Sequence, residues 1–154
     1  VESVVARVTE ENVRELVAGA DIVIDAVDNF RGKFALNQAA LDLGIPLVYG
    51  ALSGSYGLTM LILPGETACL CCVFCQEPDV GSSETAATAG VIGPTVGSVA
   101  SLQVAQALKF LVGARDALVK DLMQLDVWDG EWNFIPAPRR SDCAACGYLG
   151  GSPR

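Results

Sequence analysis

The stretch Asp21-Ile-Val-Ile-Asp-Ala-Val-Asp-Asn29 decides the fold of this chain. Its first seven residues form a compact apolar run, which is typical of a β-strand buried on both faces of a sheet. Residues 30–43 then have the pattern of a helix, with Gly44 as its terminator and Pro46 just beyond it. Residues 46–52 are predicted to form a second strand. A strand, a helix and a strand in this order predict parallel pairing with a right-handed crossover, and therefore an α/β protein.

The sequence outside this unit predicts a mixed sheet. Apolar periodicity predicts two more helices and three more strands: helices after a Thr9 cap and over residues 96–112, and strands over residues 57–63, 122–128 and 131–136. Asp129-Gly130, between the last two strands, is a turn sequence typical of a β-hairpin. Because hairpin strands are antiparallel, the last strands of the sheet are expected to be antiparallel.

Length and composition favour one domain with a hydrophobic core. The chain has 154 residues, 51% of them hydrophobic, and a net charge of −8, which disfavours a nucleic-acid or anionic-membrane surface. Residues 85–108 are uncharged but contain several Thr, Ser and Gln residues, so a buried loop and a core helix are predicted there instead of a membrane span. Six cysteines without a recognisable signal peptide favour a reducing, cytoplasmic compartment.

Two cysteine pairs predict a structural metal site. Cys69-x-x-Cys72 and Cys143-x-x-Cys146 together supply the four thiolates that usually bind zinc tetrahedrally. Cys72-Val-Phe-Cys75 has the same spacing, so the residues alone leave the ligand assignment of the first pair open. A spare thiol such as Cys71 is usually a small buried hydrophobe, although a nucleophile or persulfide carrier is the alternative. A redox dithiol explains two matched pairs less well than zinc does.

Asp28 is the first candidate for catalysis. It is predicted to follow the carboxyl end of a buried strand, where ligands bind in open α/β sheets. A carboxylate there can hold a Mg²⁺ ion whose other ligands are phosphate oxygens. The simpler alternative is that Asp28 or Asn29 only caps the following helix. The glycine cluster of residues 50, 54 and 57 matches no phosphate-binding fingerprint, so turns between strands are predicted there.

The combination of these motifs resembles the carboxyl-terminal part of the E1-like adenylating enzymes, most closely the ThiF/MoeB/HesA group, which activates ubiquitin-like sulfur-carrier proteins. The motifs that carry the resemblance span nearly the whole chain: Asp21–Asn29, Asn37, Pro46–Ala51, Cys69-x-x-Cys72, Thr88–Pro94, Gly97, Ser101–Gln103, Ala107–Lys109 and Cys143-x-x-Cys146. The resemblance implies a Rossmann-like E1 adenylation fold with a structural zinc site. Residues 1–154 would be the carboxyl-terminal part of one such domain, without its amino-terminal nucleotide-loop half.

The resemblance also implies a reaction. Enzymes of this group bind ATP and Mg²⁺, adenylate the carboxyl-terminal glycine of a carrier protein, and pass the adenylate to a sulfur nucleophile in thiamin or molybdopterin biosynthesis. Asp28 matches the catalytic aspartate at Mg²⁺ and ATP, and Asn29 adjoins it at the nucleotide. The structural zinc ligands would be Cys69, Cys72, Cys143 and Cys146, which settles the assignment of the first pair by resemblance.

Two departures from the family pattern affect the expected activity. The glycine-rich nucleotide loop and the Arg and Lys that embrace the phosphates precede the region seen here, so little or no adenylation is expected from this chain alone. Full ATP–pyrophosphate exchange would contradict that expectation. Ala86 also stands where many members carry a cysteine, which makes a thioester or persulfide at that place doubtful and favours a separate sulfur donor.

The expected partners are a ubiquitin-like sulfur carrier that ends in Gly-Gly and a second copy of the chain. Small residues at Gly93, Gly97, Ser101 and Ala105 recur every four residues and would allow close approach of another backbone, either in internal packing or at a homodimer seam. No nucleic-acid or membrane partner is expected. Two alternatives remain open: a non-catalytic, zinc-stabilised dimerisation or protein-binding module, and an E1-like enzyme that acts on tRNA or a peptide.

Overall fold

The computed structural model describes residues 1–75 and 89–149, which contain one mixed sheet. Its strands lie side by side in chain order: β1 (Val23–Ile24), β2 (Leu47–Ser53), β3 (Tyr56–Ile62), β4 (Leu122–Asp126) and β5 (Glu131–Ile135). β1 and β2 are parallel, and each later pair of neighbours is antiparallel. The predicted α/β class, with antiparallel strands at the end of a mixed sheet, is confirmed.

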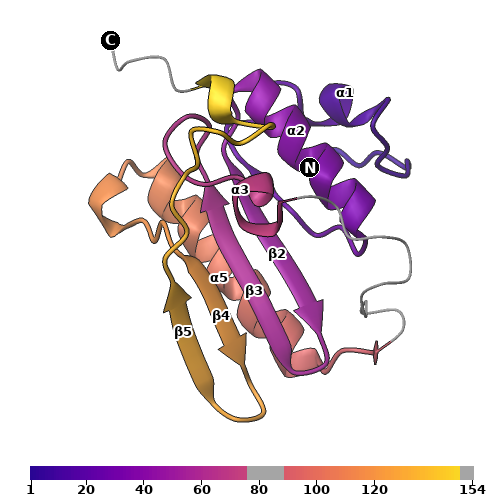
Figure 1. The fold of residues 1–154 in the computed structure, drawn as a ribbon. Helices are drawn as coiled ribbons and strands as arrows, with labels where there is room; N and C mark the ends of the chain where they lie inside the picture. Colours follow the sequence, from indigo (N-terminus) through magenta and orange to yellow (C-terminus); the bar gives the residue numbers. More distant parts are fainter. Residues whose placement is uncertain (76–88, 150–154) are drawn as a thin grey trace.

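Helices cover both faces of this sheet. The described helices are α1 (Val13–Val17), α2 (Phe30–Leu43), α3 (Leu70–Phe74), α5 (Gly93–Leu111) and the short 3-10 helices η1 (Arg115–Ala117) and η2 (Gly147–Leu149). In Figure 1, α5 lies behind the sheet, whereas α2 and α3 lie on its other side. Alternate residues of β2 serve the two cores: Leu47 and Tyr49 pack with α2, and Val48 packs with Ala107 of α5.

The ends of α2 are fixed by its own side chains and backbone. Asn29 is the N-cap, and its Oδ1 accepts a hydrogen bond of 2.8 Å from the backbone N–H of Gly32. Gly44 ends the helix in the left-handed conformation, with φ of +69°. A residue with a Cβ adopts this conformation only at a cost, which explains why the predicted terminator is glycine.

The tip of the β2–β3 hairpin anchors the segment that enters α5. The Gly54 N–H donates to Gly90 O at 2.9 Å, and the Ile92 N–H donates to Gly54 O at 3.2 Å. α5 therefore begins at Gly93, earlier than the predicted residue 96, with Pro94 in its first turn.

Among the helices in the described ranges, none combines the length and hydropathy that crossing a bilayer requires.

Two local predictions are wrong. The stretch 21–27 forms a strand only over Val23–Ile24, and Ile24 is 42% exposed, because β1 is the edge of the described sheet and β2 is its one neighbour. Thr9 does not cap α1: the helix begins at Val13 after Asn12, whose Oδ1 accepts from the Thr9 N–H at 2.8 Å.

Candidate nucleotide pocket and metal centre

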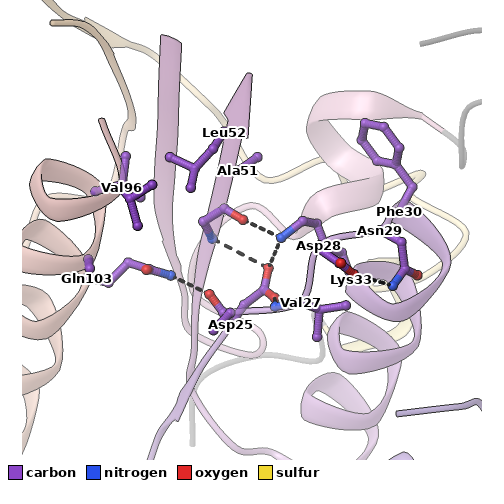
Figure 2. A pocket seen from close by; sticks show the side chains of 14 residues that line it. Asp25, Val27, Asp28, Asn29, Phe30, Lys33, Ala51, Leu52, Val96 and Gln103 are labelled. Atoms are coloured by element: carbon purple, nitrogen blue, oxygen red, sulfur yellow. Dashed lines mark hydrogen bonds and ion pairs between the residues drawn. The ribbon is translucent and has the colours of Figure 1, made fainter. Parts of the chain in front are cut away.

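A pocket of about 230 Å³ opens where β1 ends. Its walls come from the turn between β1 and α2, from residues 50–52 of β2, and from the first half of α5. Figure 2 shows Asp28 and Asn29 on the turn, with Val96 and Gln103 of α5 across the pocket. This is the edge of the sheet at which open α/β proteins bind ligands.

Asp28 is an exposed carboxylate in the wall of this pocket. Its Oδ1 accepts a hydrogen bond of 3.1 Å from Nδ2 of Asn29, and this bond holds the pKa of the Asp28 carboxyl below its ordinary value. The same Asn29 side chain caps α2 through its Oδ1. Capping is therefore done by Asn29, which leaves the Asp28 carboxylate ionised at the pocket and chemically suited to a divalent cation.

A buried ion pair lies in the same pocket as Asp28. Oδ2 of Asp25 is 2.9 Å from Nζ of Lys33, and the two side chains are only 1% and 8% exposed. Oδ1 of Asp25 accepts from the Val27 N–H at 2.8 Å, and Lys33 also donates to the carbonyl oxygen of Gly50. Sequence reasoning missed this pair, because a lysine on a helix is ordinarily assigned to the surface.

Gly50 and Gln103 fit together across the pocket. Nε2 of Gln103 donates to the backbone oxygens of Asp25 at 2.8 Å and Val48 at 3.0 Å. A Cβ on Gly50 would lie only 2.5 Å from that nitrogen. The prediction of turns for the glycine cluster is thus wrong for two of its members: Gly50 lies within β2, and Gly57 lies within β3 against Val99. Gly54, with φ of +59°, does sit in a turn.

The four paired cysteines meet at one point and could hold a metal ion. Their Sγ atoms all lie within 4.8 Å of one another. The sulfurs of Cys69 and Cys143 are 3.7 Å apart, and those of Cys72 and Cys146 are 3.5 Å apart. Zn–S bonds of about 2.3 Å in a tetrahedron place sulfurs about 3.8 Å apart, so this donor set fits zinc. Cys71 and Cys75 do not belong to the group.

The cysteine cluster joins α3 to the end of the described chain. Cys69 is the N-cap residue of α3, and Cys146 directly precedes η2. Burial raises the pKa of the Cys146 thiol, because the charged form loses its hydration. A bound divalent cation would favour the thiolates and offset this penalty.

Comparison with known protein families supports the assignment suggested by these motifs. The model of the ThiF family matches residues 1–145. The chain belongs to the ThiF family.

Curated relatives of this ThiF-family chain are named as activating enzymes. The ThiS adenylyltransferase of Bacillus subtilis is 42% identical over 149 residues, which cover 96% of this chain and 43% of that protein. The SAMP-activating enzyme E1 of Haloferax volcanii is 38% identical, over 97% of this chain and 55% of its own length. The HesA protein of Leptolyngbya boryana is 32% identical, over 96% of this chain and 52% of its own length. The chain thus spans about half the length of the curated relatives it matches.

Solved structures show the same fold at lower identity. The structure of Escherichia coli MccB with ATP aligns with a TM-score of 0.75 and 17% identity, over 93% of this chain and 44% of that chain. The mixed sheet of the ThiF-family chain therefore has the architecture of that enzyme.

The structure places most of the residues predicted from the sequence. It brings the four cysteines together and sets Asp28 and Asn29 at the pocket, whereas Ala86 lies outside the described residues. Within the described residues, Gly93, Gly97 and Ser101 of the small-residue stripe are exposed on α5, and Ala105 is half-buried.

Proposed function

We propose that this chain is the part of an ATP-dependent adenylating enzyme that supplies its cation-binding aspartate. The observation that carries the proposal is the position of Asp28. It is an ionised carboxylate at the end of a parallel strand, in the wall of a pocket, and Asn29 holds it in place. Membership of the ThiF family supports nucleotide chemistry at this place.

Asp28 and Asn29 would act on the nucleotide in different ways. Mg²⁺ held by Asp28 would offset the negative charge of the ATP phosphates while the carboxylate of the substrate attacks the α-phosphate. Asn29 orients the Asp28 carboxylate through its amide N–H, and because an amide does not titrate near neutral pH it would act without gaining or losing a proton. The apolar side chains of Val96 and Val99 on α5 would exclude water from the far wall of the pocket.

The proposed substrate is the carboxyl-terminal glycine of a ubiquitin-like sulfur-carrier protein of the ThiS or MoaD type. Several relatives are named as adenylyltransferases of sulfur-carrier proteins, which supports this choice. Pyrophosphate would leave as the acyl-adenylate forms. A sulfur nucleophile on a separate donor would then attack the acyl carbon and release AMP, which passes sulfur towards cofactor biosynthesis. The six free cysteines of the described chain suit a reducing compartment such as the cytoplasm.

Zinc is proposed to have a structural role. The cluster formed by Cys69, Cys72, Cys143 and Cys146 ties the chain's tail to α3, away from the residues that line the pocket. Four sulfur ligands close the coordination sphere, as in structural rather than catalytic zinc sites.

A homodimer is proposed because one face of α5 is exposed in the part of the chain that the structure describes. This face exposes Val96, Val104, Leu108 and Leu111 beside the small residues Gly97 and Ser101. Apolar side chains and small residues on one helix favour close packing against another protein surface. Sedimentation velocity over a range of concentrations would test it, and a monomer at every concentration would contradict it.

Paramagnetic NMR tests the assignment of Asp28. Mn²⁺ and ATP are titrated into ¹⁵N-labelled protein, a method that detects binding even at millimolar affinity. We expect the amide signals of residues 25–29 to broaden. Asp28→Asn should abolish this broadening, whereas Asp21→Asn, the same change at the other end of the strand, should not. Broadening elsewhere, or broadening that survives Asp28→Asn, would contradict the assignment.

An exchange assay tests the reaction itself. ATP–pyrophosphate exchange is measured with a carrier protein ending in Gly-Gly, with a short peptide and with tRNA. We measure it with this chain and with any longer form that contains it. The carrier should be preferred in the longer form, and Asp28→Asn should lower the exchange rate by at least ~100-fold. Preference for peptide or tRNA would replace the substrate, and no exchange with any acceptor would favour a non-catalytic module.

A further inference from the structure

The ammonium group of Lys33 lines the pocket but is directed into the protein. Its Nζ lies 2.9 Å from Oδ2 of Asp25, donates to the carbonyl oxygen of Gly50, and lies 5.4 Å from the ring centroid of Tyr49. Phe74 of α3 packs on that tyrosine with the ring centroids 5.9 Å apart, which helps to hold the ring in place. Two of the three N–H donors of this ammonium are directed at protein oxygens, and the Tyr49 ring adds a cation–π contact. Lys33 is therefore arranged to hold protein groups together.

Asp25, the partner of Lys33, is held through both its side chain and its backbone. Its Oδ1 accepts from the Val27 N–H at 2.8 Å, and its carbonyl oxygen accepts from Nε2 of Gln103 at 2.8 Å. Its side chain is only 1% exposed, so its charge depends on Lys33 for compensation. The first residue of the turn thus has a fixed position relative to β2, α2 and α5.

The contacts of Asp25 and Asn29 fix both ends of the turn that carries Asp28. At its start, Lys33 and the Val27 N–H hold the Asp25 carboxylate. At its end, Asn29 caps α2 and donates to Asp28. Figure 2 shows Lys33 on α2 and Asp25 joined across the base of this turn. Asp28 itself is exposed, so its direction is set by these neighbours. A ligand that is oriented before the cation arrives binds it more tightly, because less freedom is lost on binding.

We propose that Asp25 and Lys33 are positioning residues that hold Asp28 in the orientation that binds the divalent cation of a metal–nucleotide complex, and that Lys33 does not itself bind phosphate. The proposal rests on the proposed function, in that it takes Asp28 as the cation ligand. It assigns a role to a lysine that, from its place in the pocket wall, would otherwise be taken for a phosphate-binding residue.

Nucleotide affinity measured with and without metal separates these two roles of Lys33. In Lys33→Met, the Mn²⁺–ATP complex should bind ~10-fold more weakly, as is common when a group behind a metal ligand is lost. ATP binding in EDTA should be unchanged, and Lys33→Arg should restore most of the affinity. A direct phosphate contact predicts an equal loss with and without metal, which would overturn the proposal.

Arg31→Met is the matched control, because Arg31 lies on the same helix and pairs with Glu10 on the surface. Losing this pair should leave Mn²⁺–ATP affinity within about twofold, as exposed pairs contribute little. A loss in Arg31→Met as large as that in Lys33→Met would show a general charge effect and would count against positioning.

The folded state of the variants has its own control. Lys33→Met leaves Asp25 buried without its partner, so the double variant Asp25→Asn/Lys33→Met, which removes both charges, is made in parallel. It should fold and still bind Mn²⁺–ATP weakly. Failure of both variants to fold would show a purely structural pair and overturn the proposal.

Amide exchange of Val27 tests the positioning without any ligand. In Lys33→Met this amide should exchange ~10-fold faster, because the carboxylate that accepts its hydrogen bond is no longer held; an unchanged rate would overturn the proposal. If Asp28→Asn abolishes Mn²⁺–ATP binding and Lys33→Met does not weaken it, positioning is wrong and the proposed function stands. If Asp28→Asn leaves binding intact, Asp28 is not the cation ligand, and positioning fails together with that assignment whatever the exchange rate.

Discussion

Adding a single methyl group at Gly50 should break the hydrogen bonds that join β2 to α5 at the pocket and destabilise the protein. In Gly50→Ala, the new Cβ would lie 2.5 Å from Nε2, 2.8 Å from Cδ and 3.0 Å from Oε1 of Gln103. Carbon and nitrogen do not approach so closely without a bond, so the Gln103 side chain must move. It is 5% exposed and has little room to do so.

The cost follows from what Gln103 bonds. Its displacement removes the hydrogen bonds to the backbone oxygens of Asp25 and Val48, at 2.8 and 3.0 Å. The Val48 oxygen keeps a second donor, the Asp25 N–H at 2.9 Å, so the loss at Asp25 weighs more. A lost buried bond costs ~1–3 kcal/mol and overpacking ~1–3 kcal/mol, so we expect a destabilisation of about 3 kcal/mol. For a domain of this size, that corresponds to a Tm lower by roughly 6–12 °C.

Urea and thermal unfolding, followed by circular dichroism, measure the change. The double variant Gly50→Ala/Gln103→Ala should be no more than ~1 kcal/mol less stable than Gln103→Ala, because the two groups no longer collide. Gly97→Ala is the matched control: among the described residues its Cβ would meet nothing within 4 Å, and at concentrations where the chain is monomeric it should stabilise α5 by ~0.5–1 kcal/mol. A Gly50→Ala variant within ~0.5 kcal/mol of the wild type, or additive costs in the double variant, would refute the reasoning.

Three further predictions concern the metal centre, the helix cap and the tail. Cys143→Ser, or treatment with a strong chelator, should remove about one zinc ion per chain. Relative to wild-type protein at a free zinc concentration ~1,000-fold above the Kd, this loss should lower the free energy of unfolding by ~4 kcal/mol. Metal analysis that finds less than about one zinc per two wild-type chains would count against the site. Asn29→Ala should cost ~1 kcal/mol in urea unfolding, because the Gly32 N–H loses its acceptor, and Asn29→Asp should restore it. Burial opposes ionisation of Asp42, but hydrogen bonds, first that from Tyr148, lower the pKa of this carboxyl overall. Stability from this contact is therefore present above the ordinary carboxyl pKa of ~3.9 and lost as the pH falls through the lower folded value. Tyr148→Phe should cost ~0.5 kcal/mol at neutral pH, since the site is partly exposed, and equal costs at pH 7 and pH 2.5 would contradict this origin.

Local sequence patterns carried much of the fold and part of the site. The strand–helix–strand order, the Gly44 terminator and the Asp129-Gly130 hairpin depend on residues close in the chain, and the structure contains all three. The position of Asp28 is also predictable from neighbouring residues, because ligands of α/β sheets bind at the ends of strands. In the structure Asp28 lines the pocket. The edge position of β1 was not predictable, because strand order is a property of the whole sheet.

The α/β class and the candidate residue Asp28 follow from local patterns in the chain, because strands, helices and their ends are encoded by neighbouring residues. The choice of Cys69 and Cys72 as the first cysteine pair follows from the family resemblance, since spacing alone also allows Cys72 and Cys75. The burial of Lys33 against Asp25, and the need for a residue without a side chain at position 50 beside Gln103, are visible only in the folded chain. These contacts join residues from β1, α2, β2 and α5. Their energies depend on burial and distance across the pocket, which no stretch of sequence contains.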